Sequence, residues 1–110
     1  MSGIVVEVAP DVIDFKPGDE VCGCAGGLIG MGGALAEFML ADASLIAHKP
    51  HRLSMVKAAA LPLVSITAWE ALFERVSIKP ESAVLIHGGA GRVGHIGIQL
   101  ANRANNIMSS

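Results

Sequence analysis

The sequence has few aromatic residues, few cysteines and little charge, and each shortage excludes a class of protein. With three phenylalanines, one tryptophan and no tyrosine, its core is expected to be mostly aliphatic. Its two cysteines, Cys22 and Cys24, cannot form the disulfide framework of a small secreted domain. No apolar run reaches the roughly 18 residues that span a bilayer, and a formal net charge of −2 gives no basic surface for nucleic acid. We therefore expect a cytoplasmic protein that binds neither membranes nor nucleic acid.

Apolar residues and glycine are abundant instead. Hydrophobic residues make up 52% of the sequence and charged residues only 16%, which is enough apolar material for a folded core. Six of the thirteen glycines lie within residues 23–33. Because glycine is too permissive for a regular element, this segment is predicted to be a loop.

The first half of the chain is predicted to be rich in β-structure. Short stretches of β-branched or apolar residues are typical of strands, and turn residues separate them. Pro17 followed by Gly18 is typical of the centre of a type II turn. The segment 34–40 fits a helix or a strand equally well by its periodicity. The predicted strands are residues 3–8, 20–24 and 45–48.

The second half is predicted to contain helices and one buried strand. Ser54 is a suitable N-cap for a short helix, and Pro62 can begin a longer one that ends before residues 79–82. Residues 83–87 form the continuous apolar run that is typical of a parallel strand covered on both faces. The last predicted helix has one apolar stripe, formed by Val93, Ile96, Gly97, Leu100, Ala101 and Ala104.

The segment between that strand and the last helix has the spacing G-x-G-x-x-G, which binds nucleotide phosphates. Gly89 would permit the tight turn, Gly91 would let the backbone approach a pyrophosphate, and Gly94 would allow close packing of helix on strand. The anion would meet free N–H groups at the positive end of the helix dipole. The alternative is a glycine turn that only joins two elements. The candidate cofactor-binding residues here are Gly89, Ala90, Gly91, Arg92, Val93 and Gly94.

The choice between NAD and NADP is left open by this motif. A complete fingerprint places an acidic residue for NAD, or a basic residue for NADP, about 20 residues further on. Only 16 residues follow Gly94, and none of them is Asp or Glu. Arg92 either adds charge to a bound phosphate or is a solvated arginine at a helix start. Residues 106–110 are expected to begin a second parallel strand.

Four blocks carry a family resemblance: FKPGDEV at residues 15–21, GALAEF at 33–38, AAALPLVSITAWEAL at 58–72 and VLIHGGAGRVGH at 84–95. In order and spacing they resemble medium-chain dehydrogenase/reductases of the quinone oxidoreductase (zeta-crystallin-like) branch. The resemblance covers nearly the whole chain. It implies an α/β fold in which part of a GroES-like β domain is followed by the first strand, loop and helix of a Rossmann fold.

The resemblance also implies a domain organisation and an activity. Residues 1–52 would form the partial GroES-like domain, 53–80 a helical connection and 81–110 the start of the nucleotide-binding domain. The implied reaction is hydride transfer from NADPH, with NAD not excluded, to a quinone or an activated carbonyl or alkene. Thr67 would lie near the nicotinamide; alternatively, it is a helix residue whose hydroxyl bonds to its own backbone.

The chain also departs from the family pattern. Family members begin some dozens of residues before Met1 and contain most of the Rossmann sheet, so the chain is expected to be truncated at both ends and inactive alone. Arg92 replaces a glycine that is usual in the motif. The alternatives to an enzyme fragment are a nucleotide-binding module without catalysis and a self-associating remnant. Because exposed strand edges invite pairing, we expect a homo-oligomer.

No metal site or catalytic residue is nominated. Zinc-bearing relatives have a cysteine four residues before the position of Thr67, where this chain has Leu63, and this favours the zinc-free branch. A C-x-C pair without a second pair is poor zinc spacing. No Ser-His-Asp or Cys-His arrangement is recognisable, so the polar residues considered are expected to be structural or surface residues: Cys22, Cys24, His48, His51, His87, His95, Glu37 and Glu70.

Overall fold

The computed structural model describes residues 1–27, 30 and 32–108, and the chain divides into two compact units, Met1–Pro62 and Leu63–Ser110. The division falls at the first residue of helix α2 (Pro62–Trp69). The domain boundaries expected after residues 52 and 80 stay predictions.

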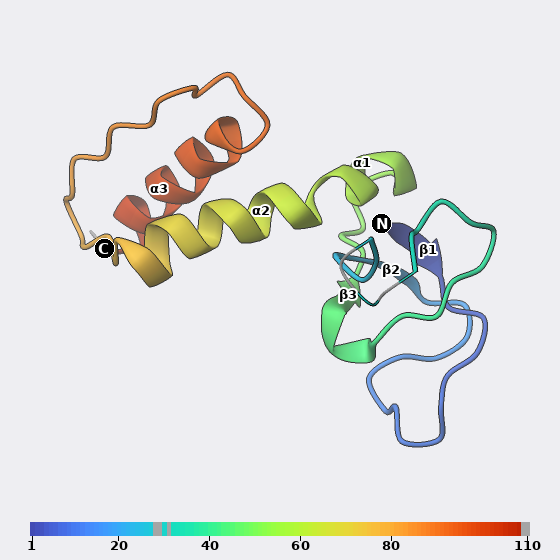
Figure 1. Ribbon diagram of the computed structural model, residues 1–110. Helices are drawn as coiled ribbons and strands as arrows, with labels where there is room; N and C mark the ends of the chain where they lie inside the picture. Colours follow the sequence, from blue (N-terminus) through green and yellow to red (C-terminus); the bar gives the residue numbers. More distant parts are fainter. Residues whose placement is uncertain (28–29, 31, 109–110) are drawn as a thin grey trace. The chain divides into compact units, whose positions relative to one another are not determined.

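The first unit contains a three-stranded antiparallel sheet in the order β1-β2-β3 (Figure 1). Its strands are β1 (Ser2–Ile4), β2 (Glu20–Gly23) and β3 (Ile46–His48). The predicted strands at 20–24 and 45–48 are confirmed, each slightly shorter than expected. The predicted strand 3–8 is shorter still, because beyond Ile4 only Val5 keeps backbone hydrogen bonds to the turn before β2.

That turn is the predicted type II turn. Gly18 has a φ of +96°, and the Asp19 amide donates to the Lys16 carbonyl at 3.1 Å. The Asp19 carboxylate accepts a second hydrogen bond from the Lys16 amide at 3.0 Å. A positive φ is needed at this position, and glycine adopts it at no steric cost.

Side chains cap the two short helices of the first unit. Ser54 Oγ accepts from the Lys57 amide at 3.4 Å and begins α1 (Met55–Ala60), as predicted. Asp42 caps the 3-10 helix η1 (Ala43–Leu45) by accepting from the hydroxyl and the amide of Ser44. These hydrogen bonds, the hydroxyl first, hold the pKa of Asp42 below its ordinary value.

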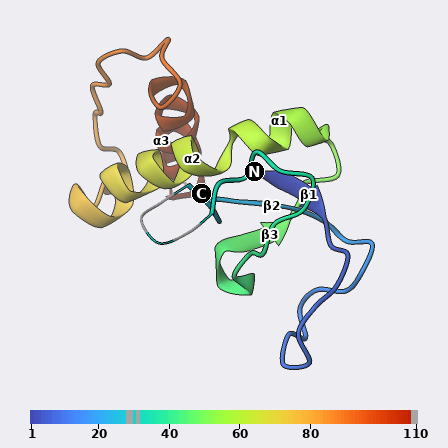
Figure 2. The ribbon, with the colours of Figure 1, turned by 45° about the vertical axis from the view of Figure 1, so that its right-hand side comes forward.

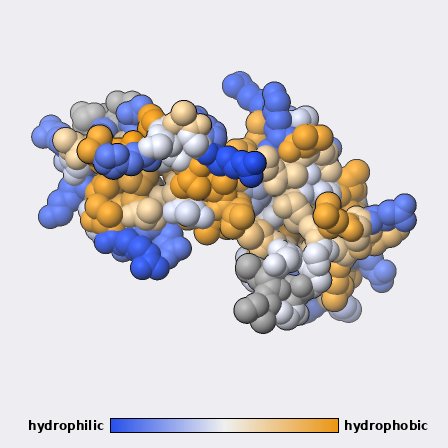
Figure 3. Space-filling model, turned by 45° about the horizontal axis from the view of Figure 1, so that its top comes forward, coloured by the Kyte–Doolittle hydropathy of each residue, from blue (hydrophilic) through white to orange (hydrophobic). Residues whose placement is uncertain are grey.

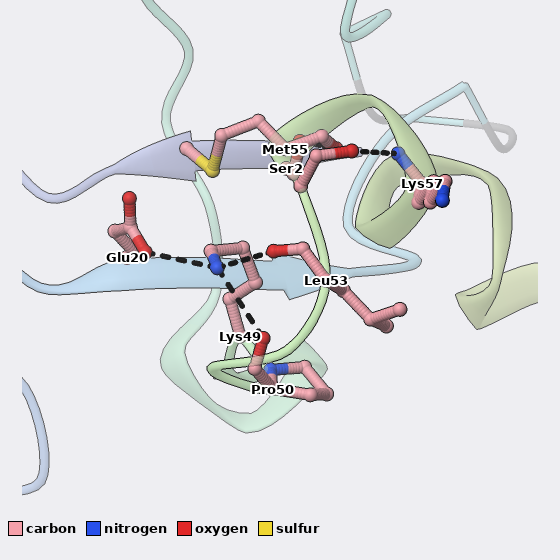
Figure 4. A network of polar contacts seen from close by, with 8 residues as sticks. Ser2, Glu20, Lys49, Pro50, Leu53, Met55 and Lys57 are labelled. Carbon is pink, nitrogen blue, oxygen red and sulfur yellow. Dashed lines mark hydrogen bonds and ion pairs between the residues drawn. The ribbon is translucent and has the colours of Figure 1, made fainter.

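A buried lysine ties the sheet to the segment before α1 (Figure 4). Lys49 is 7% exposed, and its Nζ lies 3.0 Å from Oε2 of Glu20 on β2. The same ammonium group donates to the carbonyls of Leu53 at 2.6 Å and Pro50 at 3.3 Å. A buried charge is tolerated when it is paired and hydrogen-bonded in this way.

The segment 34–40 forms neither a helix nor a strand, so both alternatives for it were wrong. Leu35 and Leu40 on it are almost fully exposed. Periodicity alone does not fix a regular element when no apolar surface covers its side chains. The described residues of the loop predicted at 23–33 are irregular beyond Gly23, which belongs to β2. Residues 28, 29 and 31 lie outside the described part.

The second unit contains two helices joined by a long irregular segment (Figure 2). Helix α2 begins at the predicted Pro62 and continues without a break as the π-helix η2 (Glu70–Arg75). Helix α3 (Gly94–Met108) carries the predicted apolar stripe except for Val93, which lies before the helix and is exposed. Gly97 and Ala101 of the stripe are buried. The rings of Trp69 and Phe73 lie 4.4 Å apart between centroids.

Two predictions for this unit were wrong. Residues 83–87 form no strand ladder within the described chain, and Leu85 is 83% exposed rather than buried. A strand is completed by a partner, and none of the described segments pairs with this one. Residues 106–108 continue α3 instead of starting a strand, and residues 109–110 lie outside the described part.

Apolar surface remains exposed on both units, as the orange areas of Figure 3 indicate. The core is small, and its buried apolar residues are mostly alanines: Val21, Ala25 and Ala58 in the first unit, and Ala68, Leu72 and Ala101 in the second.

Candidate functional site

The glycine motif forms a tight turn before α3. The Gly91 amide donates to the Gly88 carbonyl at 2.8 Å, and Gly88 has a φ of +70°. The left-handed residue of the turn is therefore Gly88 and not Gly89, the residue predicted for this turn. The Gly88-Gly89 doublet allows either residue to turn the chain.

Gly94 allows the helix start to approach the turn. A Cβ added to Gly94 would lie 2.8 Å from the Gly88 carbonyl carbon and 2.9 Å from Gly89 Cα, and it would clash with the Gly88 carbonyl oxygen. All three atoms belong to the backbone and cannot rotate away. Close packing at Gly94 is thus observed, but against the loop backbone rather than against a strand.

The start of α3 presents backbone donors. The first helical hydrogen bond runs from the His95 amide to the Gly91 carbonyl at 3.1 Å. Within the described chain, the amides of Arg92, Val93 and Gly94 donate to no backbone acceptor. The first turn of α3 carries no acidic residue, so no carboxylate competes for these amides. Such a helix start favours an anion.

Two neighbouring side chains differ in their contacts. His95 Nδ1 lies 2.9 Å from the Gly91 carbonyl oxygen, so Nδ1 carries a proton and Nε2 faces away from this contact. The Arg92 side chain is exposed beside the free amides. His87 is also exposed, at the end of the extended segment.

An open, mainly apolar pocket of about 740 Å³ lies on the second unit. Val93 and Gly94 of the loop line it together with Leu72 of η2 and Ile86 of the extended segment. Thr67 is exposed on α2 and is not among the residues lining this pocket, and its Oγ1 donates to the Leu63 carbonyl at 2.9 Å. This is the bond to its own helix that the sequence analysis considered as an alternative.

The residues considered for metal binding are dispersed. No group of three His, Cys, Asp or Glu side chains suited to a metal occurs within the described part of the chain. Cys22 and Cys24 are free and half-buried. His48 Nε2 contacts the Asp14 carbonyl at 3.2 Å. His51 is exposed. Of the two glutamates expected to be surface residues, Glu37 is exposed, and Glu70 is half-buried and pairs with Arg75 at 2.6 Å.

No helix among the described residues has the length and apolar character that crossing a membrane requires.

Known proteins similar to this chain include quinone oxidoreductases, enoyl reductases, an alcohol dehydrogenase superfamily protein and polyketide synthases. Residues 1–51 match the alcohol dehydrogenase GroES-like domain. An alcohol dehydrogenase superfamily protein from Novosphingobium aromaticivorans is 48% identical, with a TM-score of 0.91 over 94% of this chain and 31% of that chain. A mycobacterial protein in complex with NADPH is 35% identical, with a TM-score of 0.76 over 94% of this chain and 31% of that chain.

The curated relatives also include quinone oxidoreductases. The chloroplast envelope quinone oxidoreductase homolog of Arabidopsis thaliana is 37% identical over 96% of this chain and 33% of its own length. Other similar proteins are chloroplastic or mitochondrial, so the cytoplasmic location stays a prediction. The chain spans between 4% and 33% of the length of such relatives. Residues 1–51 thus match an alcohol dehydrogenase GroES-like domain, and the homologues of the chain are quinone oxidoreductases and other members of the medium-chain dehydrogenase/reductase family.

Proposed function

We propose that this chain supplies the nucleotide-phosphate loop and part of the GroES-like domain of an oxidoreductase that uses NADPH. The proposed reaction is hydride transfer to a quinone or to an activated carbonyl or alkene. The observation that carries the proposal is the loop at residues 88–94, in which the amides of Arg92, Val93 and Gly94 donate to no backbone acceptor of the described chain. The family supports it, since one of the similar structures is a complex with NADPH.

The residues present fit a pyrophosphate. The amides of Arg92, Val93 and Gly94 provide donors without backbone partners in the described chain, and Gly91 has no side chain to block their approach. No Asp or Glu follows Glu81, so the second unit beyond this residue carries only neutral and basic side chains. An anion therefore meets no like charge from this part of the chain.

Each part of the site has a limited role in this proposal. The coenzyme would supply the hydride, and the loop would hold its pyrophosphate in place. The Arg92 guanidinium would add charge beside the phosphates. We propose Thr67 as a residue near the nicotinamide. Its hydroxyl donates to the Leu63 carbonyl, so it would contact the coenzyme either by giving up this hydrogen bond or by accepting one through an oxygen lone pair.

The experiment that tests the proposal is a titration of the purified chain with NADPH, followed by nicotinamide fluorescence. Saturable binding is expected, and Gly91→Asp should weaken it at least about tenfold because its carboxylate repels phosphate. Gly91→Asn is the matched control, since it adds nearly the same bulk without the charge. Both variants bring a Cβ to 3.1 Å from the Gly88 carbonyl oxygen, so Gly91→Asn should also lose some affinity. Its loss should be smaller than that of Gly91→Asp, because asparagine carries no charge.

The outcome of this titration decides whether the loop is a phosphate site. Equal binding by the wild-type chain and Gly91→Asp would contradict a phosphate site at the loop. A NADH titration alongside would give the coenzyme preference, because NADPH differs from NADH by a 2′-phosphate.

A second expected result concerns turnover. The chain spans at most a third of the relatives just described, so we expect no NADPH oxidation with a simple quinone above the control without protein. The measurement is the decay of NADPH absorbance under saturating quinone. Oxidation that exceeds the control and disappears in Gly91→Asp would show that this chain is catalytic on its own.

Self-association without catalysis is the second candidate function. It is favoured by the apolar side chains left exposed, including Leu85 on the unpaired segment of the second unit. A defined dimer that binds no nucleotide would support this reading over that of an oxidoreductase. A homo-oligomer that also binds NADPH would be compatible with both.

A further inference from the structure

The Gly91 carbonyl is held by the backbone and by the side chain of a single residue. The His95 amide donates to it at 3.1 Å, as the first hydrogen bond of α3, and His95 Nδ1 lies 2.9 Å from the same oxygen. A carbonyl oxygen has two lone pairs, so it can accept both hydrogen bonds at once. The carbonyl is therefore fixed in its direction toward the first turn of the helix.

The direction of this carbonyl determines the direction of the next amide. The Gly91 carbonyl and the Arg92 N–H belong to one peptide unit, which is planar and trans, so the two groups point in opposite directions. Because the carbonyl points into the helix, the Arg92 N–H points away from the helix start. Within the described chain it meets no backbone acceptor there. It is one of the donors proposed above for the pyrophosphate.

The other two donors of the loop are held by fewer contacts. The Val93 carbonyl accepts one hydrogen bond, from the Gly97 amide at 2.9 Å, and this bond directs the Gly94 N–H. The Arg92 carbonyl accepts none from the described backbone, so the Val93 N–H has no comparable anchor. Among these carbonyls of the described chain, only that of Gly91 also contacts a side chain. The Arg92 N–H is thus the donor whose direction is fixed most firmly.

The ring contact depends on where the imidazole carries its proton. A neutral imidazole can carry it on either nitrogen, and a contact with a carbonyl oxygen requires it on Nδ1. The contact of His95 needs no positive charge, because the Nδ1–H donates in the neutral ring as well. No acidic residue occurs in the first turn of α3 to engage this ring instead.

We infer that His95 is a positioning residue for the proposed pyrophosphate site: it holds the Gly91 carbonyl through Nδ1 and thereby directs the Arg92 amide toward the anion. This inference rests on the proposed function of the loop. In this role His95 does not touch the anion and acts through the peptide unit between Gly91 and Arg92. A side chain that keeps a donor at the position of Nδ1 should therefore replace it.

The test compares two substitutions of His95 in the full chain. His95→Asn keeps a donor, because the side-chain amide nitrogen of asparagine lies nearly where Nδ1 lies, whereas His95→Leu removes both ring nitrogens. His95→Leu should weaken the binding of inorganic pyrophosphate about fivefold, because a hydrogen bond to a charged group is misdirected. His95→Asn should stay within about twofold of the wild type. Isothermal titration calorimetry at about pH 8, where an imidazole is neutral, measures these affinities.

Gln99 provides the matched control on the same helix. Its Nε2 donates to the His95 carbonyl at 3.1 Å, so it also makes an exposed contact from a side chain to the backbone one turn before it. Gln99→Met removes this donor at nearly constant size and does not alter the Gly91 carbonyl. The affinity for pyrophosphate should be unchanged in this variant.

Two NMR measurements distinguish positioning from a general structural role. In the free wild-type chain, the ring nitrogen signals of His95 should place the proton of the neutral imidazole on Nδ1. In His95→Leu at saturating pyrophosphate, the shift of the Arg92 amide signal should become smaller, whereas that of the Gly94 amide should be kept because the Gly97 amide still directs it. An equal loss at both amides would mean that the whole loop is disturbed, and it would overturn the inference.

The results also separate this inference from the proposed function. A wild-type chain that binds neither pyrophosphate nor NADPH would contradict the phosphate site, and the role of His95 would fall with it. If the wild type binds and His95→Leu binds equally well, the phosphate site stands and the inference alone is overturned. A neutral His95 ring with its proton on Nε2 would overturn the inference in the same way.

Discussion

Gly94 is the position in the glycine loop where an added side chain would meet the backbone most closely. Gly94→Ala would press a methyl group against the backbone of Gly88 and Gly89. We expect it to lower the free energy of unfolding of the second unit by about 1–3 kcal/mol, because these atoms cannot move aside without distorting the turn. Urea unfolding followed by the fluorescence of Trp69, the single tryptophan, measures this change.

Gly97 provides the control for that substitution. It lies in the interior of α3, and a Cβ there would make an ordinary contact of 3.4 Å with Ile86 Cδ1. Gly97→Ala should stabilise the helix by about 0.5–1 kcal/mol, since alanine has the higher helix propensity. Equal destabilisation by both substitutions would mean that any added methyl group disturbs α3 and that Gly94 has no special place.

The individual glycines were only partly predictable. The sequence motif correctly identified Gly94 as a position of close packing. It did not distinguish Gly88 from Gly89 as the residue with positive φ, because a glycine doublet meets the steric requirement at either position. The contact between the His95 ring and the Gly91 carbonyl was not predictable either, since a histidine at the start of a helix has several alternative acceptors.

Elements with local signals formed where the sequence predicted them. The N-cap Ser54, the proline at the start of α2 and the apolar stripe of α3 act within one or two turns. The continuation of α2 as the π-helix η2 had no such signal. Extra-wide turns of this kind are uncommon and arise from packing rather than from propensity.

The extended segment 83–87 failed as a predicted strand for a non-local reason. Its composition is that of a buried parallel strand, but a ladder depends on a partner that no composition supplies. The same limit applies to residues 34–40, whose apolar side chains are left uncovered. Short apolar runs therefore predicted which segments have side chains suited to a buried position. They did not predict whether other residues of the described chain cover those side chains.

The whole chain combines two compact units with different roles. The first contains the small sheet and matches the GroES-like domain, whereas the second contains the glycine loop at residues 88–94 and α3. The family was evident from sequence blocks spread over both units, because their order and spacing survive even where an element does not form. The chain covers 31% of the length of the similar Novosphingobium and mycobacterial structures.

The most direct test of this account is to follow the backbone amides of the isotopically labelled chain by NMR while NADPH is added. We expect the amide signals of Arg92, Val93 and Gly94 to shift saturably. Inorganic pyrophosphate should reproduce these shifts, because the anion alone would bind these donors. The amide of Val21 in the first unit should not move. Shifts confined to other residues, or none at the start of α3 at saturating coenzyme, would contradict a phosphate site at this loop.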